Sequence, residues 1–175
     1  TWLADSPAAT ALVLDRLQST GATAAISGYL GSRPLFSLQK STLRRSAPVF
    51  NIAAWHQDGS FLGPDARAMN VWVALTACGD GLPTPGLELI PTRVEEVLPT
   101  TNGPNSAWVT RERVEAATSV PAIRPRFNPG DALMFDERFL HRTHLTDEMT
   151  ESRDALECWF FAPSHENKKY VQLLA

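Results

Sequence analysis

The segment Trp55-His56-Gln57-Asp58-Gly59 carries residues well suited to bind a metal ion. Residues two apart at the end of an extended strand point to the same side, so His56 and Asp58 could address one ion. Gly59 would let the chain turn away directly afterwards. An HxD triplet alone is a weak signal, because many proteins have such a triplet at an ordinary polar strand end. A third ligand from elsewhere in the chain is needed to make the prediction specific.

The segment from Asp136 to His144 offers two candidates for that third ligand, His141 and His144. Two histidines and one carboxylate on one face of iron(II) leave the other coordination positions open for reactants, as in non-haem iron oxygenases. The same ligands would also suit a cupin-type hydrolase or isomerase with zinc or manganese. For His144 and His165 the simpler interpretation is surface polarity.

Arg153 and Thr143 are candidates for holding an organic anion near that metal. The planar guanidinium of a buried arginine binds a carboxylate through two parallel hydrogen bonds. Arg153 begins a strand rich in Trp and Phe, so it is either an interior anion clamp or a charge at the rim. Thr143 lies two residues after His141 and could add a hydroxyl donor on the same side.

Composition limits the class of protein. A chain of 175 residues with 43% hydrophobic content favours a single domain. The net charge of −3, without long charged runs, argues against nucleic acid or an anionic membrane as partner and favours a small-molecule substrate. Cys78 and Cys158 form no paired motif, and no apolar run is long enough to span a membrane, so we expect a cytoplasmic protein. The sequence makes no prediction of oligomeric state.

The pattern of short apolar runs between Gly, Pro, Asn and Asp predicts a mainly β fold. One amphipathic helix is expected from Ser6 to Gly21, and shorter helical pieces at Thr92 and from Thr110 to Ala117. Many short strands after one leading helix suggest a jelly roll. The expected strands are Val49 to Trp55, Met69 to Thr76, Leu87 to Ile90, Ala122 to Phe127, Ala132 to Phe135 and Leu156 to Phe161.

Five blocks between Gln39 and Pro163 resemble the phytanoyl-CoA dioxygenase family in order and spacing. They are Trp55 to Gly59, Asn70 to Leu75, Pro85 to Pro91, Pro129 to Phe135, and His141-Arg142-Thr143 followed by Arg153 and Trp159-Phe160-Phe161. The resemblance implies a double-stranded β-helix (jelly roll, cupin-like) with flanking helices. It would form one domain over 1–175, with 1–46 as helix and lead-in and 47–163 as the core.

The resemblance also implies the chemistry. It selects His141 over His144, so that His56, Asp58 and His141 would bind Fe(II), while Arg153 and Thr143, with Gln39 and Asn70, would hold the cosubstrate 2-oxoglutarate. Dioxygen would then be used to hydroxylate a small-molecule or acyl substrate, with release of succinate and carbon dioxide. Because related halogenases replace the carboxylate, the intact Asp58 favours a hydroxylase. A non-catalytic module that binds metal and 2-oxoglutarate is the alternative from this resemblance.

Several other residues could contribute to a substrate pocket. Trp55, Phe61 and Trp72 could line a dry cavity around the metal, although Trp72 fits a core position better. Four arginines, Arg44, Arg45, Arg67 and Arg138, could contact an anionic substrate, but we expect them to be solvated charges. The Pro99 to Ser106 segment is expected to be an exposed loop.

Overall fold

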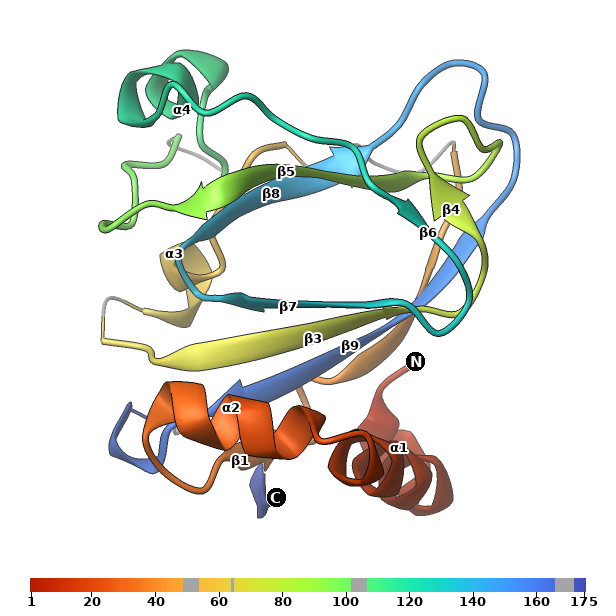
Figure 1. Cartoon of the computed structure of the whole chain (residues 1–175), viewed down its shortest axis with the longest axis vertical. Helices are drawn as coiled ribbons and strands as arrows, with labels where there is room; N and C mark the ends of the chain where they lie inside the picture. The colour runs from red at the N-terminus through yellow and green to blue at the C-terminus, as the bar shows by residue number, and fades with distance from the viewer. Residues whose placement is uncertain (49–53, 64, 102–106, 166–171) are drawn as a thin grey trace.

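Two layers of antiparallel strands face each other in the computed structural model (Figure 1). It describes residues 1–48, 54–63, 65–101, 107–165 and 172–175. The larger sheet has the order β10-β1-β9-β3-β7, with β2 also paired to β9. Its strands are β1 (Leu35–Ser37), β2 (Thr42–Ser46), β3 (Ala68–Ala74), β7 (Ala132–Asp136), β9 (Arg153–Phe161) and β10 (Gln172–Leu174).

The opposite layer is built from two short pairs of strands. Strand β5 (Gly86–Arg93) pairs with β8 (Phe139–His144), and β4 (Cys78–Gly79) pairs with β6 (Arg126–Phe127). Helix α4 (Arg111–Ala117) packs on this layer, where Val114 contacts the cluster that contains Ile90 and Leu140. Helix α3 (Gly59–Leu62) lies at the edge between the layers, and its Leu62 packs with residues of β3 and β9. This arrangement is the predicted mainly β jelly roll with flanking helices.

Strand β9 shows how the sequence divides the two faces of the larger sheet. Successive side chains on a strand point to opposite faces. Cys158 and Phe160 accordingly pack on the outer face, in the cluster that contains the helix residues Leu17 and Ile26. Ala155 packs on the inner face, among residues of both layers. The inner face of β9 therefore faces the space between the sheets.

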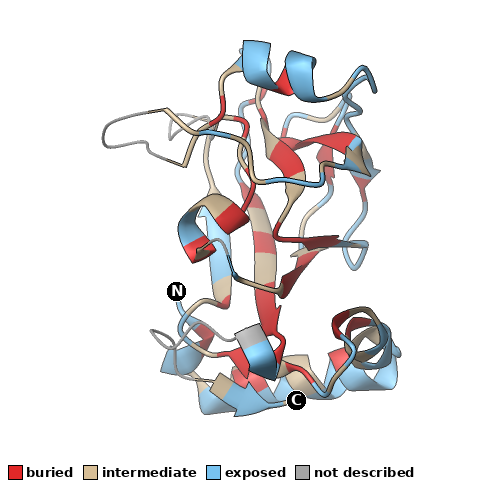
Figure 2. Cartoon of the chain, turned by 90° about the vertical axis from the view of Figure 1, so that its left-hand side faces the viewer, coloured by how far each residue is buried: buried red, intermediate tan, exposed pale blue. Residues whose placement is uncertain are grey.

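Two helices cover the outer face of the larger sheet, as Figures 1 and 2 show. Helix α1 (Pro7–Ser19) begins where Ser6 accepts a hydrogen bond from the backbone of Ala9, and Gly21, with a φ of 83°, separates it from α2 (Ala22–Leu30). Single turns of 3-10 helix, η1 (Leu3–Asp5) and η2 (Pro163–His165), complete the described elements. None of the described helices combines the length and the apolar character needed to cross a membrane.

Four of the predicted strands are confirmed as β3, β5, β7 and β9, with ends that differ by up to three residues. The predicted strand Ala122 to Phe127 is shorter, because only β6 and an isolated bridge at Ile123 pair there and Pro125 cannot donate a hydrogen bond. Most of the strand predicted at Val49 to Trp55 lies outside the described residues, as does part of the predicted loop Pro99 to Ser106.

The helical piece predicted at Thr92 is wrong. Strand β5 continues through Arg93, and residues 94–101 form no helix. Val94 and Leu98 are instead packed against a cluster around Trp55, which favours an extended path over the capping pattern. The pattern of the sequence does not predict α2, α3, β1, β2, β4, β8 and β10. Because β1 and β2 belong to the larger sheet, part of segment 1–46 is built into the core.

Candidate active site

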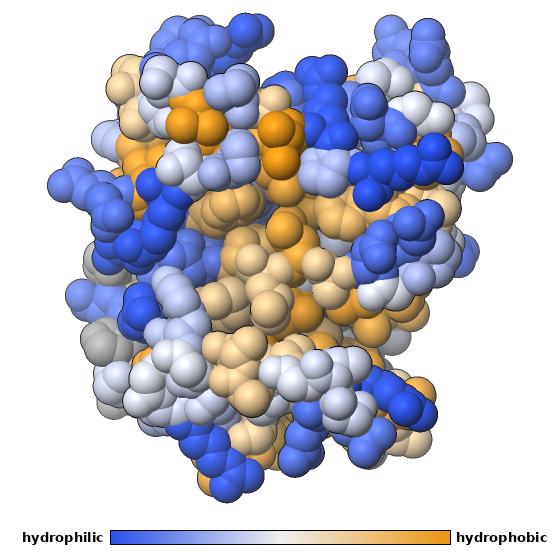
Figure 3. Space-filling model, viewed as in Figure 1, coloured by the Kyte–Doolittle hydropathy of each residue, from blue (hydrophilic) through white to orange (hydrophobic). Residues whose placement is uncertain are grey.

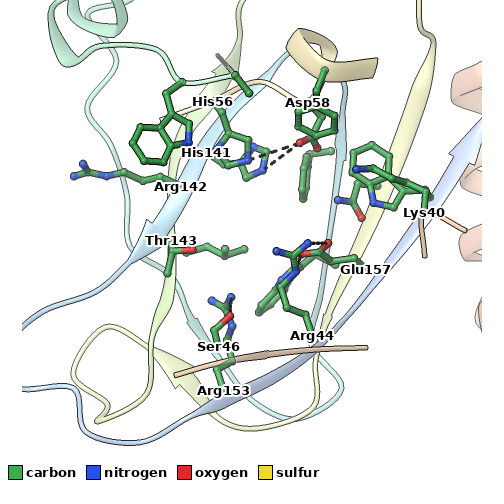
Figure 4. Close-up of a pocket in the computed structure, with 18 of the residues that line it drawn as sticks. Lys40, Arg44, Ser46, His56, Asp58, His141, Arg142, Thr143, Arg153 and Glu157 are labelled. Carbon is green, nitrogen blue, oxygen red and sulfur yellow. Dashed lines mark hydrogen bonds and ion pairs between the residues drawn. The ribbon is translucent and has the colours of Figure 1, made fainter. Parts of the chain in front are cut away.

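A cavity of about 530 Å³ opens between the two layers, within the range typical of small-molecule sites (Figure 4). Strand β8 contributes His141, Arg142 and Thr143 to its wall, and β9 contributes Arg153, Glu157 and Trp159. On the face shown in Figure 3, apolar side chains gather at the centre between the layers, and polar side chains surround them.

The backbone brings the two candidate histidine ligands together. The amide of His56 donates to the carbonyl of His141 at 3.0 Å, and the amide of His141 donates back to His56 at 3.1 Å. This reciprocal pair places the two imidazole rings side by side, with 4.2 Å between their centroids. Two residues that are distant in sequence therefore present their side chains to one point in the cavity.

Asp58 reaches the same point because Gln57 faces the other way. The fully buried Gln57 side chain donates to the carbonyls of Glu96 and Arg138 and accepts from the amide of Leu98. His56 and Asp58, one residue to either side, both face the cavity. Gly59 then begins α3 and donates to the carbonyl of Glu137 at 2.7 Å.

The donor atoms of the three residues form a compact set. The Nε2 atoms of His56 and His141 lie 3.8 Å and 3.9 Å from Oδ1 of Asp58, and all the donor atoms lie within 4.8 Å of one another. The Nδ1 atoms of both rings face backbone carbonyls, those of Ala54 and Phe139. A carbonyl only accepts, so each Nδ1 carries the proton and each Nε2 presents a lone pair.

Burial disfavours the charged form of all three side chains. It lowers the pKa of His56 and, well below the usual range, that of His141, where the neighbouring His56 adds to the effect. Both imidazoles are therefore neutral at pH 7. Burial also raises the pKa of Asp58 to about 8, opposed by the nearby Lys40 and by a hydrogen bond from Asn70.

The donor set fits a divalent transition metal. Two imidazole lone pairs and a buried carboxylate converge, and Oδ2 of Asp58 has no hydrogen-bond partner in the described structure. A buried polar atom without a partner carries a desolvation penalty, which a cation would remove. Two histidines and one carboxylate on one side are the ligands of non-haem iron(II) sites. His56, Asp58 and His141 could thus hold such an ion.

Arg153 lies at the other end of the cavity and is almost fully buried (Figure 4). Its guanidinium donates to the carbonyls of Pro85 and Gly86 and to the hydroxyl of Ser46, and Nε has no partner in the described structure. Burial lowers the pKa of Arg153, but an arginine stays charged at any physiological pH. The result is a buried cation with a free donor, next to Thr143 on the cavity wall.

Some of the other predicted residues line the cavity and some do not. Asn70, Phe61 and Trp72 line the cavity, with Asn70 beside Asp58. Gln39 is exposed and is not part of the cavity wall, so its predicted contact with a cosubstrate gains no structural support. Trp55 lies outside this cavity, with the guanidinium of Arg142 4.8 Å from its ring.

One expectation about polar residues is wrong. His144 is buried, 6% exposed, and does not line the cavity, so it is no surface residue. Arg44 is exposed, as expected of a solvated charge, but it also lines the cavity and forms an ion pair with Glu157 at 2.9 Å.

Sequence reasoning also missed Lys40, Ser46, Glu157 and Trp159 as cavity residues. A signal was present for the last two, because Glu157 and Trp159 lie four and six residues after Arg153 and so face the same side of one strand.

No protein-family model matches the chain, and no curated protein matches it significantly. Solved structures do. A crystal structure of EctD from S. alaskensis in its apo form has a TM-score of 0.73 and 19% identity, covering 95% of this chain and 57% of that one. EctD with bound Fe has a TM-score of 0.71, with 18% identity and the same coverage.

A third similar structure is the epimerase SnoN in complex with Fe3+, alpha-ketoglutarate and nogalamycin RO. Its TM-score is 0.59 at 18% identity, covering 83% of this chain and 57% of that one. At these identities the similarity establishes the fold, which confirms the predicted cupin-like jelly roll. The chain spans little more than half the length of these proteins.

Proposed function

We propose that the protein is an Fe(II)- and 2-oxoglutarate-dependent oxygenase in which His56, Asp58 and His141 bind the metal. The observation that carries this proposal is one cavity with two distinct features. At one end two neutral imidazoles and a carboxylate converge, and at the other end Arg153 is a buried cation without a carboxylate partner in the described structure. A cupin-type hydrolase or isomerase with zinc or manganese would not need the second feature, whereas a dicarboxylate cosubstrate does.

Arg153 would bind the distal carboxylate of 2-oxoglutarate. Its guanidinium is fixed by two backbone carbonyls and by Ser46, and Thr143 on the facing strand offers a hydroxyl to the same anion. Bound iron and 2-oxoglutarate together supply the activation of dioxygen, with release of succinate and carbon dioxide. The chain's own residues would hold the metal and the cosubstrate in place. Trp72 and Phe135 contribute buried apolar surface to the cavity wall.

The finer assignment is membership of the phytanoyl-CoA dioxygenase family, with hydroxylation of a small-molecule or acyl substrate. Support comes from the five sequence blocks and from the placement of His141, Thr143 and Arg153 around one cavity. The intact carboxylate of Asp58 favours hydroxylation over halogenation. The fold shared with EctD and SnoN, each crystallised with iron, agrees with this chemistry.

The decisive experiment is an anaerobic titration of the protein with iron(II) and 2-oxoglutarate, followed by visible spectroscopy. Chelation of the metal by the keto acid gives a charge-transfer band, and no knowledge of the substrate is needed. We expect a saturable band that is lost in His141→Ala and strongly weakened in Arg153→Gln.

Matched controls are His144→Ala, a buried histidine outside the cavity, and Arg16→Gln, an exposed arginine on α1. Both should keep the band. A folded, fully metallated protein without any band would refute the proposal. Release of succinate in air would separate an enzyme from a module that only binds.

A further inference from the structure

The cavity wall carries five cationic side chains, Lys40, Arg44, Arg45, Arg142 and Arg153. Three of them are neutralised by carboxylates: Arg44 by Glu157 at 2.9 Å, Arg45 by Asp154 at 2.8 Å and Arg142 by Glu88 at 2.6 Å. Among the described residues, Lys40 and Arg153 have no carboxylate oxygen within ion-pair distance. If Arg153 binds the carboxylate of the cosubstrate, Lys40 is the remaining cationic side chain of this set without an anionic partner among the described residues.

The ammonium group of Lys40 is held in a defined place. Its Nζ lies 4.3 Å from the ring centroid of Phe61 and 5.1 Å from that of Trp159, both within the range of cation–π attraction. The backbone around Lys40 is fixed as well, since the amide of Lys40 donates to Ser37 and the hydroxyl of Ser41 accepts from the amide of Trp159. Lys40 therefore presents a positioned charge to the cavity.

A second donor accompanies this charge. The indole Nε1 of Trp159 is buried and has no hydrogen-bond partner in the described structure. It belongs to one of the two rings over which Lys40 lies, and Trp159 also lines the cavity. An ammonium group and an indole N–H are both donors without acceptor capacity, so together they suit an anion.

The acidic groups near Lys40 are already engaged. Asp58 and Glu157 are the carboxylates that act on it electrostatically. Glu157 forms an ion pair with Arg44. Asp58 belongs to the candidate metal ligands, so a bound metal ion would neutralise its negative charge. In the metal-bound protein Lys40 would thus face the cavity without a counter-ion from the described chain.

Building on the proposed function, we propose that Lys40, with the indole of Trp159, binds an anionic group of the substrate, a carboxylate or a phosphate. Figure 4 shows Lys40 near Asp58 and Arg153 at the opposite end of the cavity, beside Ser46. The two cations therefore define separate anion sites, one for the cosubstrate and one for the substrate. The substrate's carbon skeleton would extend from Lys40 along Phe61 toward the metal ligands.

The test uses three probes with six carbon atoms each, hexanoate, hexyl phosphate and 1-hexanol. Their binding is measured by isothermal titration calorimetry under anaerobic conditions, to the protein alone and with iron(II) and 2-oxoglutarate present. The variants are Lys40→Met, Lys40→Arg and, as a control for the loss of one positive charge, Arg16→Met.

We expect at least one anion to bind more tightly than 1-hexanol when iron(II) and 2-oxoglutarate are present. Lys40→Met should weaken the binding of that anion by about tenfold or more and leave 1-hexanol unchanged, because a hydrogen-bonded charge pair in a partly buried site contributes at least that much. Lys40→Arg should keep most of the preference, and Arg16→Met all of it. The tighter anion identifies the carboxylate or the phosphate.

Equal affinities for all three probes, or an unchanged preference in Lys40→Met, would overturn the anion site while leaving the oxygenase assignment intact. Loss of the charge-transfer band in Lys40→Met would place Lys40 at the cosubstrate and would also overturn it. If the wild-type protein forms no band but keeps an anion preference that depends on Lys40, the proposed function is wrong and the anion site stands.

Discussion

Replacing Asp58 with Asn should stabilise the metal-free protein and remove most of the stabilisation that a bound metal provides. In the metal-free protein Asp58 is buried and its pKa is raised to about 8, so the folded state disfavours the ionised carboxylate. In the unfolded chain the same group ionises near its ordinary pKa of 3.8. Asp58 therefore lowers the free energy of unfolding progressively as the pH rises from about 4 to about 8.

The size of this destabilisation follows from the same values. The interval between pH 3.8 and pH 7, at about 1.36 kcal/mol per pH unit, sets an upper limit of roughly 4 kcal/mol at pH 7. Asn has nearly the shape of Asp but never ionises. Metal-free Asp58→Asn should thus be more stable than wild type by about 1–4 kcal/mol at pH 7, and equally stable near pH 4.

Metal binding should offset most of this difference. An ion at about 100 times its dissociation constant stabilises the folded state by about 2.7 kcal/mol. For a chain of this size each kcal/mol corresponds to about 2–4 °C in Tm, so iron(II) should raise the wild-type Tm by roughly 5–10 °C. Asn is a poor replacement for a carboxylate ligand, so the variant should show little of this increase.

Differential scanning calorimetry under anaerobic conditions, with a chelator or with iron(II), measures both effects. Asp15→Asn on the exposed side of α1 is the matched control and should change neither Tm by more than about 1–2 °C. The reasoning fails if Asp58→Asn is less stable than wild type without metal at pH 7. It also fails if iron(II) stabilises the variant as much as the wild type.

Three further predictions follow from the surroundings of the site. Gly59→Ala should lower the free energy of unfolding by about 1–3 kcal/mol in urea titrations, because its Cβ would meet Val97 Cγ2 at 2.8 Å and the carbonyl of Glu137 at 3.0 Å. Gly28→Ala, with open space in α2, should instead stabilise by about 0.5–1 kcal/mol, and similar effects for both would contradict the packing argument. Gln57→Leu should cost about 2–4 kcal/mol, since two carbonyls and one amide lose their buried partner; a change below about 1 kcal/mol would show that water replaces the side chain. Metal binding between pH 5 and 7 should release about one proton per ion from the Asp58 carboxyl group, because burial keeps this group protonated in the metal-free protein. Calorimetry in buffers of different ionisation enthalpy detects the released proton, and a metal affinity independent of pH would exclude this.

The sequence predicted the strands that form short apolar runs bounded by turn residues. Strands β3 and β9 are rich in Val, Trp and Phe and lie centrally in the larger sheet, so burial on both faces agrees with their intrinsic preference. Helix α2 was missed because its sequence carries Gly28 and begins at Gly21 without a side-chain cap, so that only packing on the sheet stabilises it.

Two of the candidate metal ligands, His56 and Asp58, were predictable from their local spacing, and His141 was selected by the family resemblance. The proposed anion site at Lys40 was not predictable. His56 and Asp58 are separated by one residue, and the parity of a strand end suffices to place them on one side. Lys40 lies in a turn, where no periodicity says which way a side chain points. Its neighbours Phe61 and Trp159 come from α3 and β9, and only the folded chain brings the three together.

Substitution of the candidate metal ligands should leave the fold intact. The His56 and His141 rings are positioned by reciprocal backbone hydrogen bonds, which any residue other than proline retains at these positions. Gln57, in contrast, satisfies buried backbone groups with its own side chain and is fully buried. Stability near the site therefore depends on Gln57, which faces away from the cavity, whereas metal binding would depend on His56 and Asp58, which face into it. A site built in this way can change its ligands, and hence its reactivity, with little loss of stability.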